Sequence, residues 1–403
     1  MQKAWQALSS HVLADGKLIH VQPIGEDPRK FDPQSSDVFA VGGFLLAGSE
    51  MYRMALASDA AVQEISVRNP GADYRLEQSV ELAQRGDLVV MDALTSRILP
   101  SQKLADGLLF QTDLAGQETR RYLLIPRQKL PAVPAVQARA HARFVPERLD
   151  DFAWENDRVA HRTYGPAVMR DPKELLVSSG IDVWSKSTRK LVLDDWYRRA
   201  DYHLDRGDGL DFYHVGSSRG CGGLGIYAGQ SLYPSRNFSA WKVLADGPLR
   251  AEFELRFEHW NVAGRPVAEV RRVQLDAGSH FSRIESRFDS ADKAPLTVGV
   301  GIVQREGKGH YQQGSNSMSY WEPAQGSDGS NACAVIVPGA STYLNQAGHY
   351  LALAPAKPAT PFVYYLGSAW SKGGDFSNAA VWDAHVAATA SRVTEPLVIQ
   401  RIR

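Results

Sequence analysis

The densest group of titratable and aromatic side chains lies in one short stretch, DYHLDRGDGLDFYHVGSSRGCGG, residues 201–223. Its six glycines predict a loop with several unusual backbone angles. Around them stand Tyr202, His203, Asp208, Asp211 and Tyr213. Polar side chains on a loop that a rigid sheet presents are typical of functional sites. The alternative is a solvated loop whose aspartates cap turns. We favour the functional interpretation because so many such groups converge.

These residue types suit proton transfer or metal binding. An imidazole such as His203 can act as a general base near neutral pH, and a tyrosine hydroxyl can act as an acid. His203, Asp205, Asp208 and Asp211 also offer the nitrogen and oxygen ligands that a divalent cation takes. Their spacing lacks the final glutamate of an EF-hand. We therefore expect no cofactor, with a divalent cation at these four residues as the weaker alternative.

A second polar stretch, DDFAWENDRVAHRTYGP, residues 150–166, supplies cations. If it is an extended strand, Arg158, Arg162 and Tyr164 share one face, because side chains alternate along a strand. Two cations and a phenol on one face would suit a carboxylated ligand. A solvent-facing strand with cross-strand ion pairs explains the pattern equally well.

Further candidates lie elsewhere in the chain. Lys186 stands in DVWSKST, and Arg236 and Asn237 stand in YPSRNF. Tyr320 and Trp321, in SMSYWEP, could line a carbohydrate groove because aromatic faces stack on sugar rings. The alternatives are a solvated surface lysine, a turn asparagine and ordinary core aromatics.

Composition narrows the class of partner. The 403 residues contain 45 Lys plus Arg and 45 Asp plus Glu, so no net field draws the chain to nucleic acid or to an anionic membrane. No apolar run is long enough to span a bilayer. The N-terminus lacks the residue order of a signal peptide, and localisation stays open. We expect a small or neutral partner.

The pattern of apolar and polar residues changes near residue 60. Before it, apolar residues at helical spacing predict two helices, the second starting at Asp37, and such a pair needs a larger body to bury its apolar faces. After it, short alternating segments predict a mainly β fold. We expect a small β-sandwich or N-terminal strands over 61–126, a Pro-rich linker over 127–150 and a large antiparallel β-sandwich over 151–403.

The motifs from residue 61 onward resemble a known family. The stretch DDFAWENDRVAHRTYGP, together with GIDVWSKST, DYHLDRGDGLDFYHVGSSRGCGG, YPSRNF and QLDAGSHFSRIE, is similar to the bacterial domain of unknown function 4861. This resemblance implies a galactose-mutarotase-like β-supersandwich, an architecture that handles carbohydrates. A fold-level likeness does not fix the reaction.

The first 57 residues resemble something else. DGKLIHVQPIG and DVFAVGGFLLAGSEMYRMA are similar to the C-terminal end of the unsaturated rhamnogalacturonyl hydrolases, glycoside hydrolase family 105. The resemblance implies a helical remnant of a six-hairpin barrel, from a truncated product or a fusion. The catalytic part of that family is absent, so we expect no hydrolase activity. A fused or neighbouring unsaturated uronyl hydrolase is the expected protein partner.

Such a hydrolase needs a supplier of unsaturated uronyl groups. Cleavage by a lyase and dehydration of a terminal uronate both start with loss of the C5 proton. We expect Arg162 or Lys186 to neutralise the uronate carboxylate, His203 to act as base and Tyr202 or Tyr213 to act as acid. The expected ligand is a uronate-containing oligosaccharide. The residues expected to bind it are Arg158, Tyr164, Asp208, Asp211, Arg236, Asn237, Tyr320 and Trp321. The alternatives are a noncatalytic carbohydrate-binding module and a sugar epimerase or mutarotase.

Overall fold

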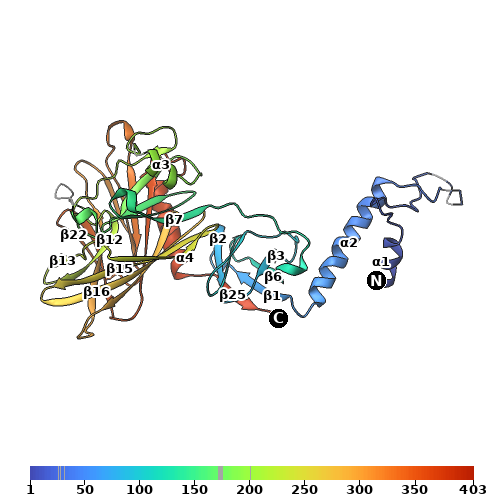
Figure 1. Cartoon of the computed structure of the whole chain (residues 1–403), viewed down its shortest axis with the longest axis horizontal. Helices are drawn as coiled ribbons and strands as arrows, with labels where there is room; N and C mark the ends of the chain where they lie inside the picture. Colours follow the sequence, from blue (N-terminus) through green and yellow to red (C-terminus); the bar gives the residue numbers. More distant parts are fainter. Residues whose placement is uncertain (26, 28, 31, 171–175, 200) are drawn as a thin grey trace.

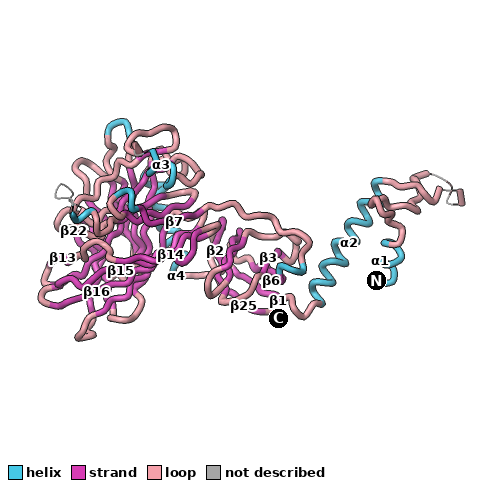
Figure 2. Tube along the Cα trace, in the orientation of Figure 1, coloured by secondary structure: helices cyan, strands magenta, loops and turns pink. Residues whose placement is uncertain are grey.

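The computed structural model describes residues 1–25, 27, 29–30, 32–170, 176–199 and 201–403. Over these residues the predicted fold class is confirmed: the chain is mainly β, its sheets are antiparallel, and a short helical pair precedes them (Figures 1 and 2). The helices are α1 (Gln2–Ser9), α2 (Val38–Ser58), α3 (Leu193–Arg199) and α4 (Ala379–Thr394). Single 3-10 turns occur at η1 (Arg127–Lys129), η2 (Pro146–Arg148), η3 (Val168–Arg170) and η4 (Gly326–Asp328).

A small sandwich follows the helices. Its first sheet has the order β25 (Val398–Arg401), β1 (Gln63–Arg68), β6 (Thr119–Pro126) and β3 (Leu88–Asp92). Its second sheet has the order β2 (Arg75–Leu82), β5 (Leu108–Leu114) and β4 (Ser101–Lys103). Apolar residues from both sheets, including Val67, Val90 and Phe110, form one buried core. We call this unit the small sandwich.

A much larger sandwich makes up most of the rest. One sheet has eight strands, in the order β14 (Ala240–Asp246), β15 (Arg250–Val262), β16 (Arg265–Asp276), β17 (Phe281–Asp289), β24 (Phe362–Trp370), β21 (Asn331–Ile336), β20 (Ser317–Trp321) and β19 (His310–Gln313). A second sheet has the order β13 (Ser231–Tyr233), β12 (Cys221–Ala228), β18 (Leu296–Val303), β23 (His349–Ala356) and β22 (Thr342–Gln346). The third has the order β11 (Gly209–Leu210), β10 (Asp182–Lys186), β9 (Ala160–Thr163), β8 (Asp151–Asn156) and β7 (Ala140–Val145).

Alternation along the strands builds the core of the large sandwich. Phe152 and Trp154 of β8, Val300 of β18 and Phe253 of β15 belong to one continuous buried cluster. The intervening residues of β8 to β10 point away from that cluster. On this outer face Trp184 packs under α3, where Trp196 stacks on it with ring centroids 5.2 Å apart. The outer face is therefore a second, smaller buried layer.

Two strands depart from what the local pattern indicated. β7 lies inside the segment expected to be a Pro-rich linker, and pairs with β8 from Ala140↔Asn156 to Val145↔Asp151. β25, expected within the large sandwich, pairs with β1 from Ile65↔Arg401 to Arg68↔Val398. The β25 pairing depends on a partner far away in the sequence, whereas β7 pairs with β8, the next strand along the chain. The domain boundaries themselves remain a prediction.

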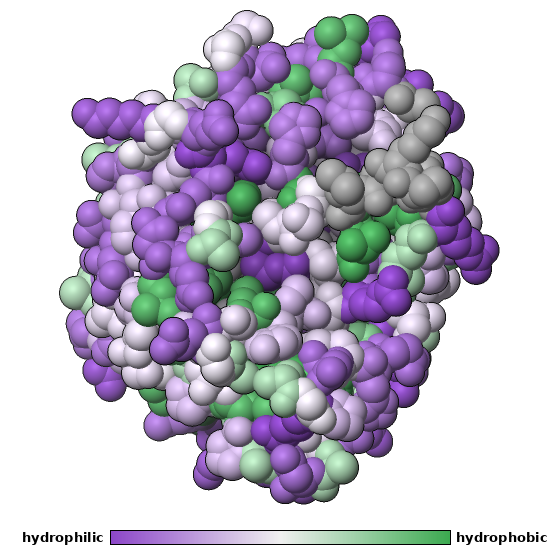
Figure 3. Space-filling view, turned by 90° about the vertical axis from the view of Figure 1, so that its left-hand side faces the viewer, coloured by the Kyte–Doolittle hydropathy of each residue, from purple (hydrophilic) through white to green (hydrophobic). Residues whose placement is uncertain are grey.

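The helical pair extends away from both sandwiches (Figure 1). Trp5 stacks on Phe44 at 4.9 Å between ring centroids, but Leu56 is the only residue of α2 that is buried. Leu46, for example, is 72% exposed. In contrast, the remote end of the large sandwich shows a mainly hydrophilic surface with separate apolar patches (Figure 3). No helix among the described residues has the length and apolarity that crossing a bilayer requires.

Candidate active site

Arg162, on the outer face of β9, lies at the centre of a buried polar cluster. Its Nε donates to Asp182 Oδ2 at 2.9 Å, and its Nη2 donates to Asp211 Oδ2 at 2.8 Å. Its Nη1 lies 3.5 Å from Asp151 Oδ2 and 3.4 Å from the Tyr202 hydroxyl. All three carboxylates are buried. We call Arg162 and these three aspartates the acid cluster.

The acid cluster holds more carboxylates than Arg162 alone can neutralise. Burial raises the pKa of Asp211 well above its ordinary value, and the neighbouring Asp182 charge adds to that effect. Burial likewise raises the pKa of Asp151 to about 7, although Arg162 opposes it. The Oδ1 atom of Asp151 is buried without a hydrogen-bond partner among the described residues. Burial therefore favours the protonated form of both carboxyl groups more than water does.

The local sequence explains how the cluster is assembled. Ala153 of β8 and Asp182 of β10 are both opposite Arg162 in register, so their side chains share its face. The loop that carries Asp211 reaches this face because Gly209 pairs with Lys186. A Cβ on Gly209, whose φ is 115°, would lie 2.0 Å from the Ser185 carbonyl oxygen. Only glycine fits this approach.

His203 stands at the surface directly above the cluster. Its Nδ1 lies 2.8 Å from the Asp211 carbonyl oxygen, and its side chain is 67% exposed. A carbonyl oxygen only accepts hydrogen bonds, so neutral His203 carries its proton on Nδ1 and directs the Nε2 lone pair to solvent. The Tyr202 ring lies 4.6 Å from the imidazole. The predicted proximity of His203, Tyr202, Arg162 and Asp211 is thus present in the structure.

Tyr164 and Arg148 complete the surroundings. The Tyr164 hydroxyl donates to Asp182 Oδ2 at 3.1 Å, so this predicted substrate-binding residue belongs to the buried layer. Burial alone would lower the pKa of Arg148, but the Asp151 charge and a hydrogen bond with Tyr202 raise it. Sequence reasoning missed Arg148 because it lies in the expected linker. Its position beside Asp151 follows from the unexpected strand β7.

Lys186 and Arg162, the two cations expected to hold a substrate carboxylate, are already neutralised by the protein. Lys186 Nζ lies 2.7 Å from Glu155 Oε2, and both side chains are fully buried. Glu155 Oε1 also accepts the backbone N–H groups of Val192 and Leu193 at the start of α3. This pair therefore fixes α3 onto the sheet. A substrate carboxylate would have to displace Glu155 to reach Lys186.

Tyr213 lies apart from His203, in the main core. The Cys333 thiol lies 3.6 Å from the Tyr213 hydroxyl, and the Arg305 guanidinium lies 4.4 Å from the Tyr213 ring centroid. Burial raises the pKa of Tyr213 well above its ordinary value. Tyr320 belongs to the same region, where its hydroxyl accepts from the Arg305 backbone N–H at 3.3 Å. Of the two predicted acids, Tyr202 alone adjoins His203.

The four residues considered for a divalent cation have other partners. Asp208 accepts from Trp196 Nε1 at 3.2 Å and pairs with Arg199 at 2.9 Å. Asp205 accepts the backbone N–H of Gly207 at 2.8 Å. Among the described residues, no three His, Cys, Asp or Glu side chains are grouped as metal ligands.

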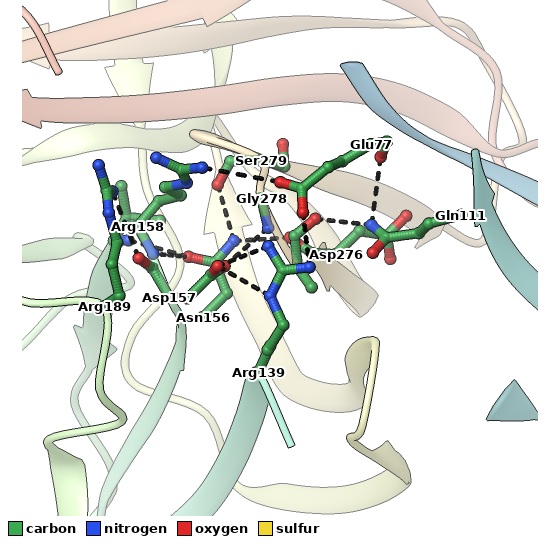
Figure 4. A network of polar contacts seen from close by, with 12 residues as sticks. Glu77, Gln111, Arg139, Asn156, Asp157, Arg158, Arg189, Asp276, Gly278 and Ser279 are labelled. Atoms are coloured by element: carbon green, nitrogen blue, oxygen red, sulfur yellow. Dashed lines mark hydrogen bonds and ion pairs between the residues drawn. The ribbon is translucent and has the colours of Figure 1, made fainter. Parts of the chain in front are cut away.

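Arg158 lies in a different network, at the junction of the two sandwiches (Figure 4). Its Nη1 lies 3.2 Å from Asp375 Oδ1, and its Nη2 lies 3.6 Å from Glu77 Oε2. Arg158 lies in the bend between β8 and β9, and its guanidinium does not reach the acid cluster. The two predicted cations of this stretch therefore serve separate regions.

The remaining candidates do not join His203 either. Asn237 is buried, and its amide donates to the carbonyl oxygens of Gly165 and Leu176 at 2.9 and 2.8 Å. Trp321 packs against the apolar cluster beneath α4. Arg236 is exposed on the loop after β13.

Two solved structures share a distant likeness with this chain. One is an alpha-mannosidase from Enterococcus faecalis V583, with 9% identity and a TM-score of 0.46 over 90% of this chain and 49% of that chain. The other is a protein in the Glycosyl Hydrolase Family 38 from Enterococcus faecalis, with 10% identity and a TM-score of 0.49 over 90% of this chain and 50% of that chain. This chain thus spans about half the length of either.

Sequence comparison gives a firmer relationship. "Uncharacterized protein P7" from Formosa agariphila is 30% identical over 393 residues, covering 88% of this chain and 98% of the relative. Residues 63–399 match the family described as "Domain of unknown function (DUF4861)". This match includes both sandwiches and excludes α1 and α2. The chain belongs to the DUF4861 family.

Proposed function

We propose that the chain is a carbohydrate-active protein that forms 4,5-unsaturated uronyl ends by β-elimination, as a lyase or a dehydratase. One observation carries the proposal: the exposed His203 imidazole is oriented by the Asp211 carbonyl oxygen and stands above a cluster that retains protons. That arrangement supplies a general base next to proton donors. The family resemblance to carbohydrate-handling sandwiches supports the choice of a sugar substrate.

The proposed step balances in atoms and electrons. His203 Nε2 takes the C5 proton of the uronate, and the C5–H electron pair forms the C4=C5 double bond. The C4–O bond breaks, and the leaving oxygen takes a proton from the Tyr202 hydroxyl. The leaving group is water in a dehydration and a sugar hydroxyl in a lyase cleavage. Arg162, 3.4 Å from the Tyr202 hydroxyl, stabilises the tyrosinate that remains until it is reprotonated.

A cation must lower the pKa of the C5 proton by neutralising the adjacent carboxylate. Because the Arg162 and Lys186 side chains are buried, we assign this role to the less buried Arg148. Arg148 is only half-buried and contacts the same Tyr202 hydroxyl. This assignment replaces the sequence-based choice of Arg162 or Lys186 within the same reaction.

The test is the ultraviolet absorbance of the conjugated double bond during incubation with uronate oligosaccharides from pectin, ulvan and glucuronan. We expect absorbance to rise with at least one substrate. His203→Ala should lower the rate about 100-fold or more. His214→Ala, an exposed histidine on the same loop, is the matched control and should retain the wild-type rate. An unchanged rate in His203→Ala would remove His203 from the reaction.

A second candidate function is a noncatalytic carbohydrate-binding module attached to an unsaturated rhamnogalacturonyl hydrolase. The exposed apolar side of α2 favours it, since Leu45 and Leu46 need a covering partner. In this proposal α1 and α2 are the last helices of the hydrolase barrel. It predicts calorimetric binding of uronate oligosaccharides without any rise in absorbance. A rise that depends on His203 would exclude it.

A further inference from the structure

A cleft lies where the small sandwich meets the large one. Its volume is about 420 Å³, within the range of small-molecule sites. It is lined by β2 of the small sandwich, by β16 and β17 of the large sandwich, by α4, and by residues 396–399. None of its lining residues belongs to the His203 site. We call it the junction cleft.

The carboxylates that line the junction cleft are all paired with arginines. Glu77 Oε1 lies 2.7 Å from Arg139 Nη1, and Figure 4 shows this pair within the network at the junction. Asp276 and Glu81 both pair with Arg250, at 2.6 and 2.5 Å. Each carboxylate of the lining therefore has an arginine partner, and Asp276 and Glu81 share theirs.

Two arginines in the same lining have no such partner. The guanidinium groups of Arg75 and Arg392 form no ion pair within the described part of the chain, and each donates only to a backbone carbonyl oxygen. Arg75 Nη2 donates to the Glu395 carbonyl at 2.7 Å, and Arg392 Nη2 donates to the Tyr74 carbonyl at 3.2 Å. Arg392 Nε is buried with no acceptor among the described residues.

The surroundings of Arg75 and Arg392 disfavour the charged form of both guanidinium groups. Burial lowers the pKa of Arg75, and the charge of Arg392 lowers it further, although Glu395 and Asp73 act in the opposite direction. Burial also lowers the pKa of Arg392. An oxyanion placed between the two guanidinium groups would reverse both effects, since arginine binds carboxylates through paired N–H donors.

The rest of the lining suits a sugar ring. Phe281 and Tyr365 contribute aromatic surface from β17 and β24. His385 of α4 is neutral, because burial and the neighbouring His280 lower its pKa to about 4. We propose that the junction cleft binds an oligosaccharide that carries carboxylate groups, with Arg75 and Arg392 holding one carboxylate. This site is distinct from the His203 site and stands whether or not elimination occurs there.

The test is isothermal titration of the full chain with trigalacturonate, with maltotriose as the neutral sugar and inorganic sulfate as the free anion. All titrations use the His203→Ala variant, so that heat from substrate turnover is not measured as heat of binding. We expect trigalacturonate to bind at least about tenfold more tightly than either comparison ligand. Arg392→Gln should weaken trigalacturonate binding about tenfold or more, because a charge-assisted pair is lost.

Arg120→Gln is the matched control. It removes an arginine of β6 in the small sandwich that pairs with Glu118 outside the cleft, and it should leave the affinity unchanged. Arg75→Gln should weaken binding as Arg392→Gln does, while the more exposed Arg392 keeps the test valid if Arg75→Gln unfolds.

Three results would each overturn the proposal: equal affinity in Arg392→Gln and its background, equal affinity for maltotriose, or equal affinity for sulfate alone. Failure of the elimination proposal is read separately, from absorbance. The two proposals can therefore fail independently.

Discussion

The acid cluster and the junction cleft differ in the acceptors that surround their arginines. Arg162 is surrounded by three carboxylates, more than its single charge requires. Arg75 and Arg392 lie in the same lining with carbonyl acceptors only. The first arrangement raises the pKa of Asp151 and of Asp211, and the second leaves two arginines without an ion pair among the described residues. Strongly perturbed buried charges are more frequent at functional sites, and this supports the two proposals.

The difference also teaches how to interpret a predicted cation. Arg162 and Lys186 look like substrate-binding residues in the sequence, but each is a structural partner of buried carboxylates. Arg75 and Arg392 carry no motif, and neither forms an ion pair among the described residues. Arg75 is as buried as Arg162, so the presence of a carboxylate partner separates the two classes, and exposure alone does not.

The largest expected effect is on stability. Arg162→Met leaves three buried carboxylates without their cation and should lower the free energy of unfolding by about 3–5 kcal/mol. Denaturant unfolding measures it. Arg198→Met, which removes an exposed partner of Asp195, should cost less than about 1 kcal/mol. Similar losses in both variants would mean that Arg162 does not organise the cluster.

The next effect is a pH dependence that Asp151 of the acid cluster contributes. Asp151 has a pKa of about 7 in the folded chain against 3.8 ordinarily, so the folded state binds its proton more tightly. Its stabilising contribution is full below 3.8 and is lost as pH rises through about 7. Wild type should lose up to about 1.4 kcal/mol per pH unit relative to Asp151→Asn in that window.

Unfolding free energies of both proteins at about pH 5 and about pH 8 measure this difference. Parallel pH profiles would show that Asp151 ionises as it does in the unfolded chain. They would also remove the claim that the cluster retains protons near neutral pH.

The smallest effect concerns the junction cleft. Arg392→Gln breaks no ion pair among the described residues, so it should change the free energy of unfolding by less than about 1 kcal/mol. The same denaturant experiment measures it beside Arg162→Met. A loss as large as that of Arg162→Met would make Arg392 a structural residue and would contradict the contrast between the two regions.

The fold was largely predictable because alternation along strands encodes it. The pattern placed Arg162 and Tyr164 on one face of a strand; in the structure β9 ends at Thr163, and both side chains contact Asp182. The strands that escaped prediction are those whose identity depends on distant partners. β25 contains four exposed residues, and only its pairing with β1 makes it a strand of the small sandwich.

The site was predictable in part for the same reason. His203, Tyr202 and Asp211 lie within one short loop, so the local sequence was enough to predict that they are close together. The Asp182 carboxylate that pairs with Arg162 lies 20 residues away, and the Glu155 that pairs with Lys186 lies 31 residues away. No local pattern reveals such pairs. The junction cleft depends on contacts between separate units, and Arg148 was missed because its segment was expected to be a linker.

The most direct test of the central claim compares initial rates of unsaturated product formation, by ultraviolet absorbance, for wild type, His203→Ala and Arg392→Gln on one uronate oligosaccharide. We predict that His203→Ala lowers kcat about 100-fold or more, while Arg392→Gln leaves kcat near the wild-type value. Equal rates in wild type and His203→Ala, or no product from any uronate substrate, would contradict the account.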